Sequence, residues 1–370
     1  MTSSKAKTTK KRVFSPNLDL GEEAKITKRN PIPEMKTMNK NKNNQQNNKP
    51  YASLSLDLDN KWSYMKTHGD RGWETFPSYL DIVVPRFLEF LKARNQTITV
   101  FIVGQDAALE KNHQALKAIA DAGHEIGNHS FNHEPWLHLY SEAEIEQEIV
   151  IAQQQIKQVT GKRPIGFRGP GFSISQNTLQ VLKRQGYEYD ASTFPTFLGP
   201  LARAYYFLTT KLDPEEQRKR KALFGSLAEG FRPLKPYHWH LDAGEIVEIP
   251  VTTMPIFKVP IHVSYILYLS QFSTGLALLY FRIAMLLCRL TGVQPSLLLH
   301  PLDFLGYDDA PELAFFPAMK LPSAKKIEIL SQVLNLMSDR FTIVTMQQYA
   351  REVSQKANLP LVQPNFQHNC

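Results

Sequence analysis

From residue 51 onward, segments in which apolar residues recur at every second position alternate with segments in which they recur at helical spacing. The first kind predicts strands and the second predicts helices. The segment YASLSLDLD, residues 51–59, has the two-residue period of a strand and ends in two carboxylates. Residues 78–94 place apolar side chains at helical spacing. TITVFIVG, residues 97–104, is a short apolar, β-branched run typical of a buried strand. The folded part is therefore predicted to begin as strand, helix and strand.

This alternation continues toward the C-terminus. Residues 141–160 predict a long amphipathic helix, because Ser141 and Glu144 have capping-box spacing and Gly161 follows the last turn. Further helices are expected at residues 112–122, 175–185 and 323–338, and further strands in GHEIGNHS (123–130), IGFRG (165–169), YEYDAS (187–192), IVEIPVTT (246–253), SLLLHP (296–301) and FTIVTM (341–346). Strands that alternate with helices favour a parallel sheet with its ligand site at the C-terminal strand ends. We therefore predict an α/β fold, a distorted (β/α) barrel with parallel strands.

Two segments interrupt the alternation. Residues 199–244 are rich in Pro, Arg and Tyr and are interpreted as an insertion over the site. Residues 263–291 are strongly apolar, but polar residues interrupt the first half, and Arg282 and Arg289 interrupt the second. No run of about 20 apolar residues remains, so a buried or surface-packing helix pair is expected rather than a transmembrane span. Peripheral contact of 263–291 with a membrane is the alternative.

The net charge of the chain is concentrated at one end. Residues 1–50 hold 12 Lys and Arg against 4 Asp and Glu, which accounts for the whole net charge of +8. They are predicted to be a disordered basic tail, either solvated or an arm for an anionic partner such as a membrane surface. Residues 51–356 are predicted to be the catalytic domain, and residues 357–370 a C-terminal tail. The balanced charge of the folded part gives no reason to expect a nucleic-acid partner.

The N-terminus and the cysteines indicate where in the cell the protein is expected. The basic N-terminus lacks the apolar core of a signal peptide. The two cysteines, Cys288 and Cys370, form no disulfide framework. A cytoplasmic protein is therefore expected, with membrane association through 263–291 as the alternative.

Two aspartates and two histidines follow predicted strands and suit a metal site. Asp57 and Asp59 end the first strand, where a turning chain can bring both carboxylates to one site. The alternative is a pair that caps the following turn. His129 and His133 have the spacing of one face of a helical turn, within reach of one ion. Two imidazoles and one carboxylate leave positions open for water and substrate, as hydrolytic zinc sites require.

Five motifs, in order over about residues 51–303, resemble those of the polysaccharide deacetylase family, also called the NodB homology domain or carbohydrate esterase family 4. The matching segments are SLDLD (55–59), HSFNH (129–133), Arg168-Gly169-Pro170-Gly171, YDASTF (189–194) and LLLH (297–300). Members of the family remove N-acetyl groups from sugars. The resemblance implies the distorted barrel of the deacetylases and a hydrolase that acts on carbon–nitrogen bonds other than peptide bonds.

The resemblance also implies roles at a metal site. Asp59, His129 and His133 would hold Zn²⁺, or another divalent cation such as Co²⁺ or Ni²⁺. Asp57 would be the general base that takes a proton from the activated water. Arg168 would pair with Asp57 and orient it.

The resemblance implies two further roles, and the sequence departs from the family pattern at two places. His300 would be the general acid that protonates the departing amine, and Asp190 would help to set its charge state. Leu58 separates the two aspartates, as in a divergent Asp-x-Asp branch of the family. The tryptophan expected in the fourth motif is absent after Asp190. Because that motif helps to line the acetyl pocket, the sugar and the acyl group stay open.

Aromatic residues of the 199–244 insertion are candidates for a replacement wall: Tyr205, Tyr206, Tyr237 and Trp239. Such side chains could stack on a sugar ring, or they could pack the insertion against the barrel.

The predicted function is a metal-dependent hydrolase that cleaves the N-acetyl amide of an N-acetylated sugar, and such a carbohydrate is the expected partner. One alternative is another C–N hydrolase on the same scaffold, such as a deformylase or a ring-opening amidase. The other is a non-catalytic glycan-binding protein. Candidate metal ligands, base and acid are all present, which disfavours the last alternative.

Overall fold

The computed structural model describes residues 49–199, 201, 227–356 and 358–366, and all structural statements concern these residues. The predicted basic tail, apart from Lys49 and Pro50, lies outside the described residues. Tyr205 and Tyr206 also lie outside them.

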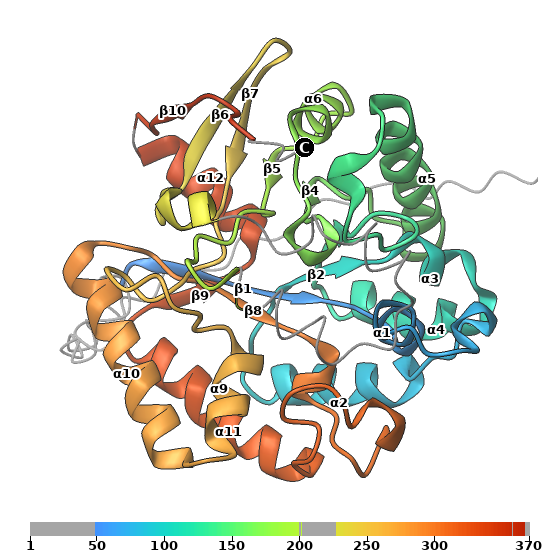
Figure 1. Cartoon of the computed structure of the whole chain (residues 1–370), viewed down its shortest axis with the longest axis vertical. Coiled ribbons are helices and arrows are strands. Elements are labelled where there is room, and N and C mark those ends of the chain that lie inside the picture. Colours follow the sequence, from blue (N-terminus) through green and yellow to red (C-terminus); the bar gives the residue numbers. More distant parts are fainter. Residues whose placement is uncertain (1–48, 200, 202–226, 357, 367–370) are drawn as a thin grey trace, which may run out of the picture. The chain divides into compact units, whose positions relative to one another are not determined.

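The strands form one curved sheet at the centre of the molecule (Figure 1). Their bounds are β1 Tyr51–Asp57, β2 Thr99–Ile102, β3 Glu125–Asn128, β4 Gly166–Phe167, β5 Tyr189–Asp190, β6 Tyr237–Leu241, β7 Gly244–Glu248, β8 Ser296–Leu299, β9 Thr342–Val344 and β10 Leu361–Val362. The order is β10-β6-β7-β5-β4-β3-β2-β1-β8, and β9 pairs with β1. Neighbouring strands are parallel except β6 and β7, which form an antiparallel hairpin.

A short seam joins the chain after β7 to the start of β8. The Thr252 N–H donates to the carbonyl oxygen of Ser296 over 3.0 Å. In return, the Ser296 N–H donates to the Thr252 hydroxyl over 2.8 Å. The sheet therefore closes through two hydrogen bonds rather than a regular ladder of paired residues. The predicted distorted barrel with mostly parallel strands is confirmed.

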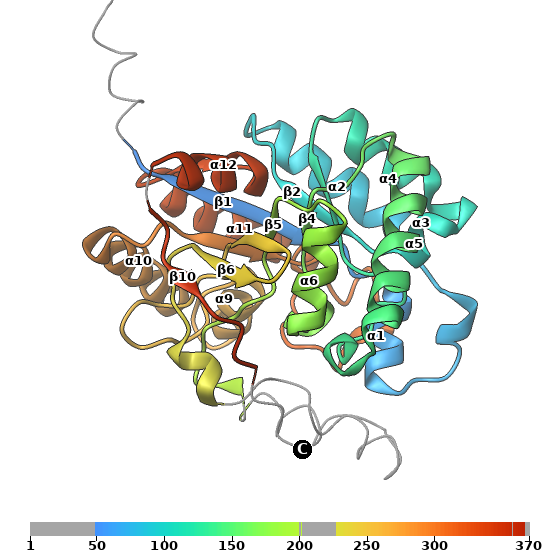
Figure 2. The ribbon, with the colours of Figure 1, turned by 90° about the horizontal axis from the view of Figure 1, so that it is seen from above.

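Helices cover the barrel on opposite sides (Figures 1 and 2). Their bounds are α1 Lys61–His68, α2 Leu80–Lys92, α3 Gly104–Ala108, α4 His113–Asp121, α5 Glu142–Thr160, α6 Gln176–Arg184, α9 Val263–Ser270, α10 Thr274–Thr291, α11 Ser323–Ser338 and α12 Met346–Lys356. In both views α3, α4 and α5 gather on one side of the barrel, and α9, α10 and α11 on another. The predicted helix pair in 263–291 is α9 and α10.

Local sequence explains how α5 forms and why it packs closely. Ser141 accepts a hydrogen bond from the Glu144 N–H, and the Glu144 carboxylate accepts one from the Ser141 N–H, so the predicted capping box is present. Along its length α5 packs against Gly104. A Cβ added to Gly104 would lie 2.6 Å from Cα of Ala152 on α5. The Gly104 N–H also donates to the carbonyl oxygen of Ser130 over 2.8 Å. The glycine therefore ties the close helix packing to the loop that carries the two histidines.

The described part of the 199–244 insertion is built into the sheet. Strand β6 pairs with β7, from Tyr237 opposite Glu248 to Leu241 opposite Gly244. Tyr237 and Trp239 are fully buried in an apolar cluster. For these two aromatic residues, packing against the barrel is therefore the correct interpretation, and a sugar-stacking wall is not.

The predicted C-terminal tail is also corrected. Strand β10 pairs in parallel with β6, with Leu361 opposite His238 and Val362 opposite Trp239. The ring of Phe366 lies 5.5 Å from that of Trp239, centroid to centroid. Residues 358–366 therefore belong to the folded domain, because β6 offers them an edge for pairing and an aromatic surface to cover.

Candidate active site

Asp59, His129 and His133 converge at the C-terminal ends of β1 and β3. Their ligand atoms lie within 4.8 Å of one another. Nε2 of His133 is 2.9 Å from Oδ1 of Asp59, and Nε2 of His129 is 3.3 Å from the same oxygen. All three side chains are buried, His129 most deeply. The structure thus brings the three predicted ligands together, while their role as ligands stays a prediction.

The loop that carries the two histidines is not the helical turn that their spacing suggested. Ser130 and His133 have left-handed backbones, with φ of 60° and 52°. Glu148 on α5 holds the loop, because its carboxylate accepts from the N–H groups of Phe131 over 3.0 Å and Asn132 over 2.8 Å. The spacing identified two histidines that do converge on one point. Two left-handed residues and a buried carboxylate, rather than helical periodicity, turn both imidazoles toward one point.

The orientation of His129 fits a metal ligand. Its Nδ1 lies 2.6 Å from the carbonyl oxygen of Arg168, which can only accept a hydrogen bond. Nδ1 therefore carries a proton, and Nε2 faces Asp59. Ligand atoms at about 2.0–2.1 Å from a tetrahedral Zn²⁺ lie roughly 3.3 Å apart, which is close to the two separations between Asp59 and the imidazoles, 2.9 and 3.3 Å. Two imidazoles and a carboxylate also suit Co²⁺ and Ni²⁺. The residues therefore fit a divalent cation.

The charges of the cluster support one another. Burial alone would raise the pKa of Asp59, but His133 and His129 hold it well below its usual value. Burial would lower the pKa of His129, and the carboxylates of Asp57 and Asp59 raise it instead. Because a cation must displace imidazole protons, we expect cation binding to release protons.

Replacing His129 with alanine is expected to abolish stoichiometric binding of Zn²⁺, because one of three converging donors is lost. The measurement is metal content by mass spectrometry after dialysis. His124→Ala is the matched control, since His124 is a buried histidine outside the cluster. Equal zinc content in wild type and His129→Ala would exclude His129 as a ligand.

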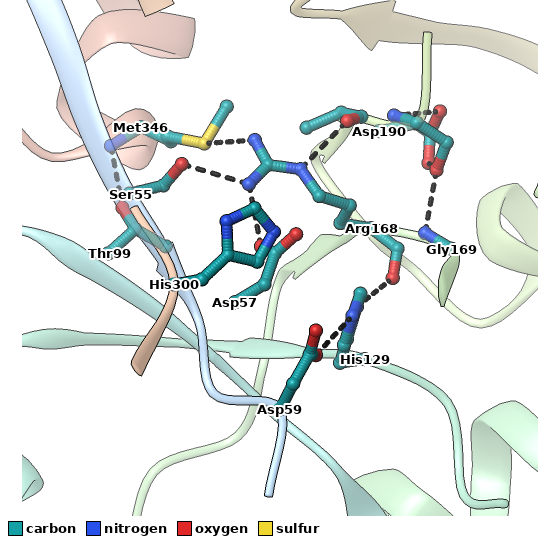
Figure 3. Close-up of polar contacts among 12 residues, drawn as sticks. Ser55, Asp57, Asp59, Thr99, His129, Arg168, Gly169, Asp190, His300 and Met346 are labelled. Atoms are coloured by element: carbon teal, nitrogen blue, oxygen red, sulfur yellow. Dashed lines mark hydrogen bonds and ion pairs between the residues drawn. The ribbon is translucent and has the colours of Figure 1, made fainter. Parts of the chain in front are cut away.

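Asp57 and Arg168 form a buried ion pair beside the cluster (Figure 3). Nη1 of Arg168 donates to Oδ1 of Asp57 over 2.7 Å and to the hydroxyl of Ser55 over 2.9 Å. Nε donates to the carbonyl oxygen of Ala191 over 2.9 Å. The guanidinium is fully buried and lies over the ring of Phe101, 4.5 Å from its centroid. These contacts fix the charge that faces Asp57, as the predicted pairing requires.

A second buried carboxylate holds the turn after Asp59. Oδ1 of Asp106 accepts from Asn60 Nδ2 over 2.7 Å, from Trp62 Nε1 over 3.0 Å and from Asn112 Nδ2 over 3.0 Å. The other oxygen, Oδ2, is buried and has no hydrogen-bond partner among the described residues. Burial raises the pKa of Asp106 to about 7. The carboxyl therefore carries a proton over much of the acidic range and positions the residues that follow Asp59.

Replacing Asp106 with asparagine is expected to stabilise the protein progressively as the pH rises. An unfolded aspartate has a pKa of about 3.9, so between about pH 4 and 7 only the folded chain keeps this proton. The free energy of unfolding of the wild type therefore falls over that window by up to about 4 kcal/mol through this group. Asp106→Asn removes the loss. Urea denaturation at pH 5 and pH 8 measures it, with exposed Asp121→Asn as the control. Parallel pH dependence in wild type and Asp106→Asn would contradict the assignment.

His300 follows β8 and reaches a carboxylate through a serine. Leu56 and Leu299 are register partners in β1 and β8, so Asp57 and His300 leave neighbouring strand ends at the same level. The hydroxyl of Ser264 donates to Oδ1 of Asp303 over 2.7 Å and lies 3.1 Å from Nδ1 of His300. Its one proton is used on Asp303, so the hydroxyl accepts from Nδ1–H of His300. This leaves Nε2 of His300 as the nitrogen for proton exchange.

Asp190 lies away from the polar contacts of His300. Ser192 donates to Asp190 through its hydroxyl over 2.7 Å and its N–H over 3.1 Å. Asp190 and Glu248 are register partners in β5 and β7, and their side chains share a hydrogen bond. Burial raises the pKa of both carboxyls, that of Glu248 more strongly. Among the hydrogen bonds and ion pairs of the described residues, none joins Asp190 to His300, so the predicted tuning of His300 by Asp190 stays a prediction without a contact to support it.

Four residues around the site were not singled out from the sequence: Asp106, Glu148, Glu248 and Ser264. A sequence signal exists for two of them, since Glu248 stands inside the apolar run IVEIPV and Asp106 follows a buried strand. Ionisable groups in such positions need a partner. Ser264 has no local signal, because its contact with His300 spans 36 positions.

Comparisons with known proteins match part of this chain. The family model described as polysaccharide deacetylase matches residues 67–189. The peptidoglycan deacetylase of Helicobacter pylori is 32% identical over 164 residues, which cover 44% of this chain and 55% of that protein. A peptidoglycan-N-acetylmuramic acid deacetylase of Bacillus subtilis is 33% identical over 105 residues, which cover 28% of this chain and 39% of that protein. The chain thus spans about half or less of the length of these relatives.

The fold is shared with solved structures. A putative polysaccharide deacetylase from Mycobacterium smegmatis superposes with a TM-score of 0.56 at 19% identity, covering 86% of this chain and 96% of that chain. A probable polysaccharide deacetylase from Pseudomonas aeruginosa has a TM-score of 0.51 at 17% identity, covering 83% and 91%. Residues 67–189 therefore match the polysaccharide deacetylase family, and the described chain shares its fold with solved structures described as polysaccharide deacetylases.

Proposed function

We propose that the chain is a divalent-metal-dependent hydrolase that removes the N-acetyl group from an N-acetylated sugar in a polysaccharide or glycan. One observation carries the proposal. The cluster of Asp59, His129 and His133 lies beside the buried pair of Asp57 and Arg168, and all five residues come from the C-terminal ends of β1, β3 and β4. A cation site next to a carboxylate with a fixed counter-charge is the arrangement that water activation requires.

The residues of the chain divide the reaction between them. A divalent cation at the cluster would polarise the amide carbonyl and make a water molecule more acidic. Asp57 accepts a proton from that water, while Arg168 holds the Asp57 carboxylate in place. The water oxygen bonds to the carbonyl carbon, the C–N bond breaks, and His300 gives a proton to the departing amine. Acetate and a free amino sugar result.

The names of the relatives support the substrate class. The two proteins named above are described as deacetylases of peptidoglycan and of its N-acetylmuramic acid. The family match over residues 67–189 includes the histidine loop. We therefore propose an N-acetylated amino sugar as the acyl donor.

The test is an acyl-release screen with the full chain loaded with Zn²⁺, Co²⁺ or Ni²⁺. Chitin oligomers, peptidoglycan fragments and lipid-linked amino sugars serve as substrates, and acetate and formate are quantified in parallel. Acetate release that chelation removes is the expected result. Formate without acetate would make the chain a deformylase. Glycan binding without hydrolysis, at full metal occupancy, would make it a binding protein.

A further inference from the structure

The outer face of α10 carries a continuous apolar stripe. Five large aliphatic side chains are between 44 and 73% exposed, at spacings of three and four residues: Leu276, Leu279, Ile283, Leu286 and Leu290. Phe272, just before the helix, is 77% exposed, and its ring lies 5.6 Å from that of the partly exposed Tyr268. Scattered exposed apolar residues are ordinary on soluble proteins, but a helical stripe of this length marks an interaction surface.

The opposite face of α10 is part of the protein core. Its buried side chains lie in the main hydrophobic cluster: Ala277, Phe281, Ala284, Met285 and Cys288. By length and composition α10 could cross a membrane. Crossing would require withdrawing this face from α9 and α11, at the cost of the core that they form together. The helix is therefore suited to lie along a surface, with one face in the protein and the other outside.

The charges around the stripe select the kind of surface. Asp and Glu are absent from the sequence between Glu248 and Asp303, a stretch that the structure describes in full. Arg282 and Arg289 are exposed on α10 beside the stripe. A second copy packed on this face would set arginine against arginine, and neither α9 nor α10 has a carboxylate to pair them. An anionic surface provides the missing counter-charge.

We propose that the outer face of α10 binds an anionic lipid membrane, with the helix axis along the membrane and the stripe in the headgroup region. Phe272 and Tyr268 then lie where aromatic side chains are favoured at membrane–water interfaces. Arg282 and Arg289 extend toward lipid phosphates. The preceding helix, α9, carries Ser264, which contacts His300, so α9 and α10 connect this surface to the candidate active site.

Vesicle sedimentation with the full chain tests the proposal. Wild type is expected to sediment with equimolar phosphatidylcholine and phosphatidylglycerol, and much less with phosphatidylcholine alone. Leu279→Glu with Ile283→Glu is expected to lower the partition coefficient by at least roughly tenfold, because two apolar side chains leave the lipid and two like charges face it. Arg282→Gln is expected to reduce the preference for the anionic vesicles.

The matched control is Ile82→Glu with Leu139→Glu. These residues are 41 and 51% exposed, against 48 and 44% for Leu279 and Ile283, and the change in net charge is the same. Loss of binding in the stripe variant with retention in the control supports the proposal. Equal binding by both variants, abolished by salt, would assign binding to the basic N-terminal residues instead and overturn it. A dimer in light scattering that the stripe substitutions dissociate, without vesicle binding by wild type, would also overturn it in favour of a second copy.

Discussion

Replacing Asp57 with asparagine is expected to lower acetate release by about 10²–10⁴-fold, the usual contribution of a general base. Asparagine keeps the size of the side chain but cannot take a proton from water. Asp59, His129 and His133 are unchanged, so the variant is expected to bind the same amount of divalent cation. Steady-state kinetics on the best substrate of the acyl-release screen and metal content by mass spectrometry measure the two effects.

A general base is distinguished from a metal ligand by comparing turnover with metal content in the same variant. Asp121→Asn, an exposed change on α4, controls for the loss of a negative charge. Near-normal turnover by Asp57→Asn would remove Asp57 from the role of base. Loss of the cation together with activity would make Asp57 a ligand instead.

Replacing Arg168 with methionine is expected to destabilise the fold by about 3–5 kcal/mol, because it leaves the Asp57 carboxylate buried without its counter-charge. Arg168 also donates to Ser55 and to the carbonyl oxygen of Ala191, and these acceptors lose their partner. The thermal midpoint is expected to fall by roughly 5–10 °C. Differential scanning calorimetry at neutral pH measures the change.

Two further variants separate charge from packing. Arg184→Met removes a partly exposed arginine from α6 and is expected to change the midpoint little, since its ion pairs are solvent-screened. The double variant Asp57→Asn, Arg168→Met is expected to be more stable than Arg168→Met alone, because the buried charge has gone. A double variant less stable than both single variants would show that the two side chains contribute independently.

The regular part of the fold could be predicted because its signals are local. Strand β1 alternates and ends in carboxylates, and α5 has a capping box and a terminal glycine. Each of these patterns depends on residues within a few positions of one another. The five strand ends that carry the predicted site residues also lie where parallel β/α units place them.

The irregular part could not be predicted because its signals are long-range. Strand β6 occurs in a segment rich in Pro, Arg and Tyr, and it becomes a strand only because β7 follows and β10 returns to its edge. The histidine loop depends on Glu148, which lies on the following helix. The contact between His300 and Ser264 needs α9 to pack beside β8. Local periodicity contains none of these pairings.

The two-bond seam between Thr252 and Ser296 has a consequence for how such a chain can diverge. Two strands paired along their whole length accept additional residues only at their ends. A seam of two hydrogen bonds constrains the backbone at only two residues, so the chain between Thr252 and Ser296 can lengthen or shorten. In this chain that stretch carries α9 and α10. Strands β1 and β3, which precede the candidate metal cluster, lie outside this stretch, and β1 pairs directly with β8. Changes in α10 can therefore leave the candidate metal cluster in place, whereas changes in α9 also affect the contact of Ser264 with His300.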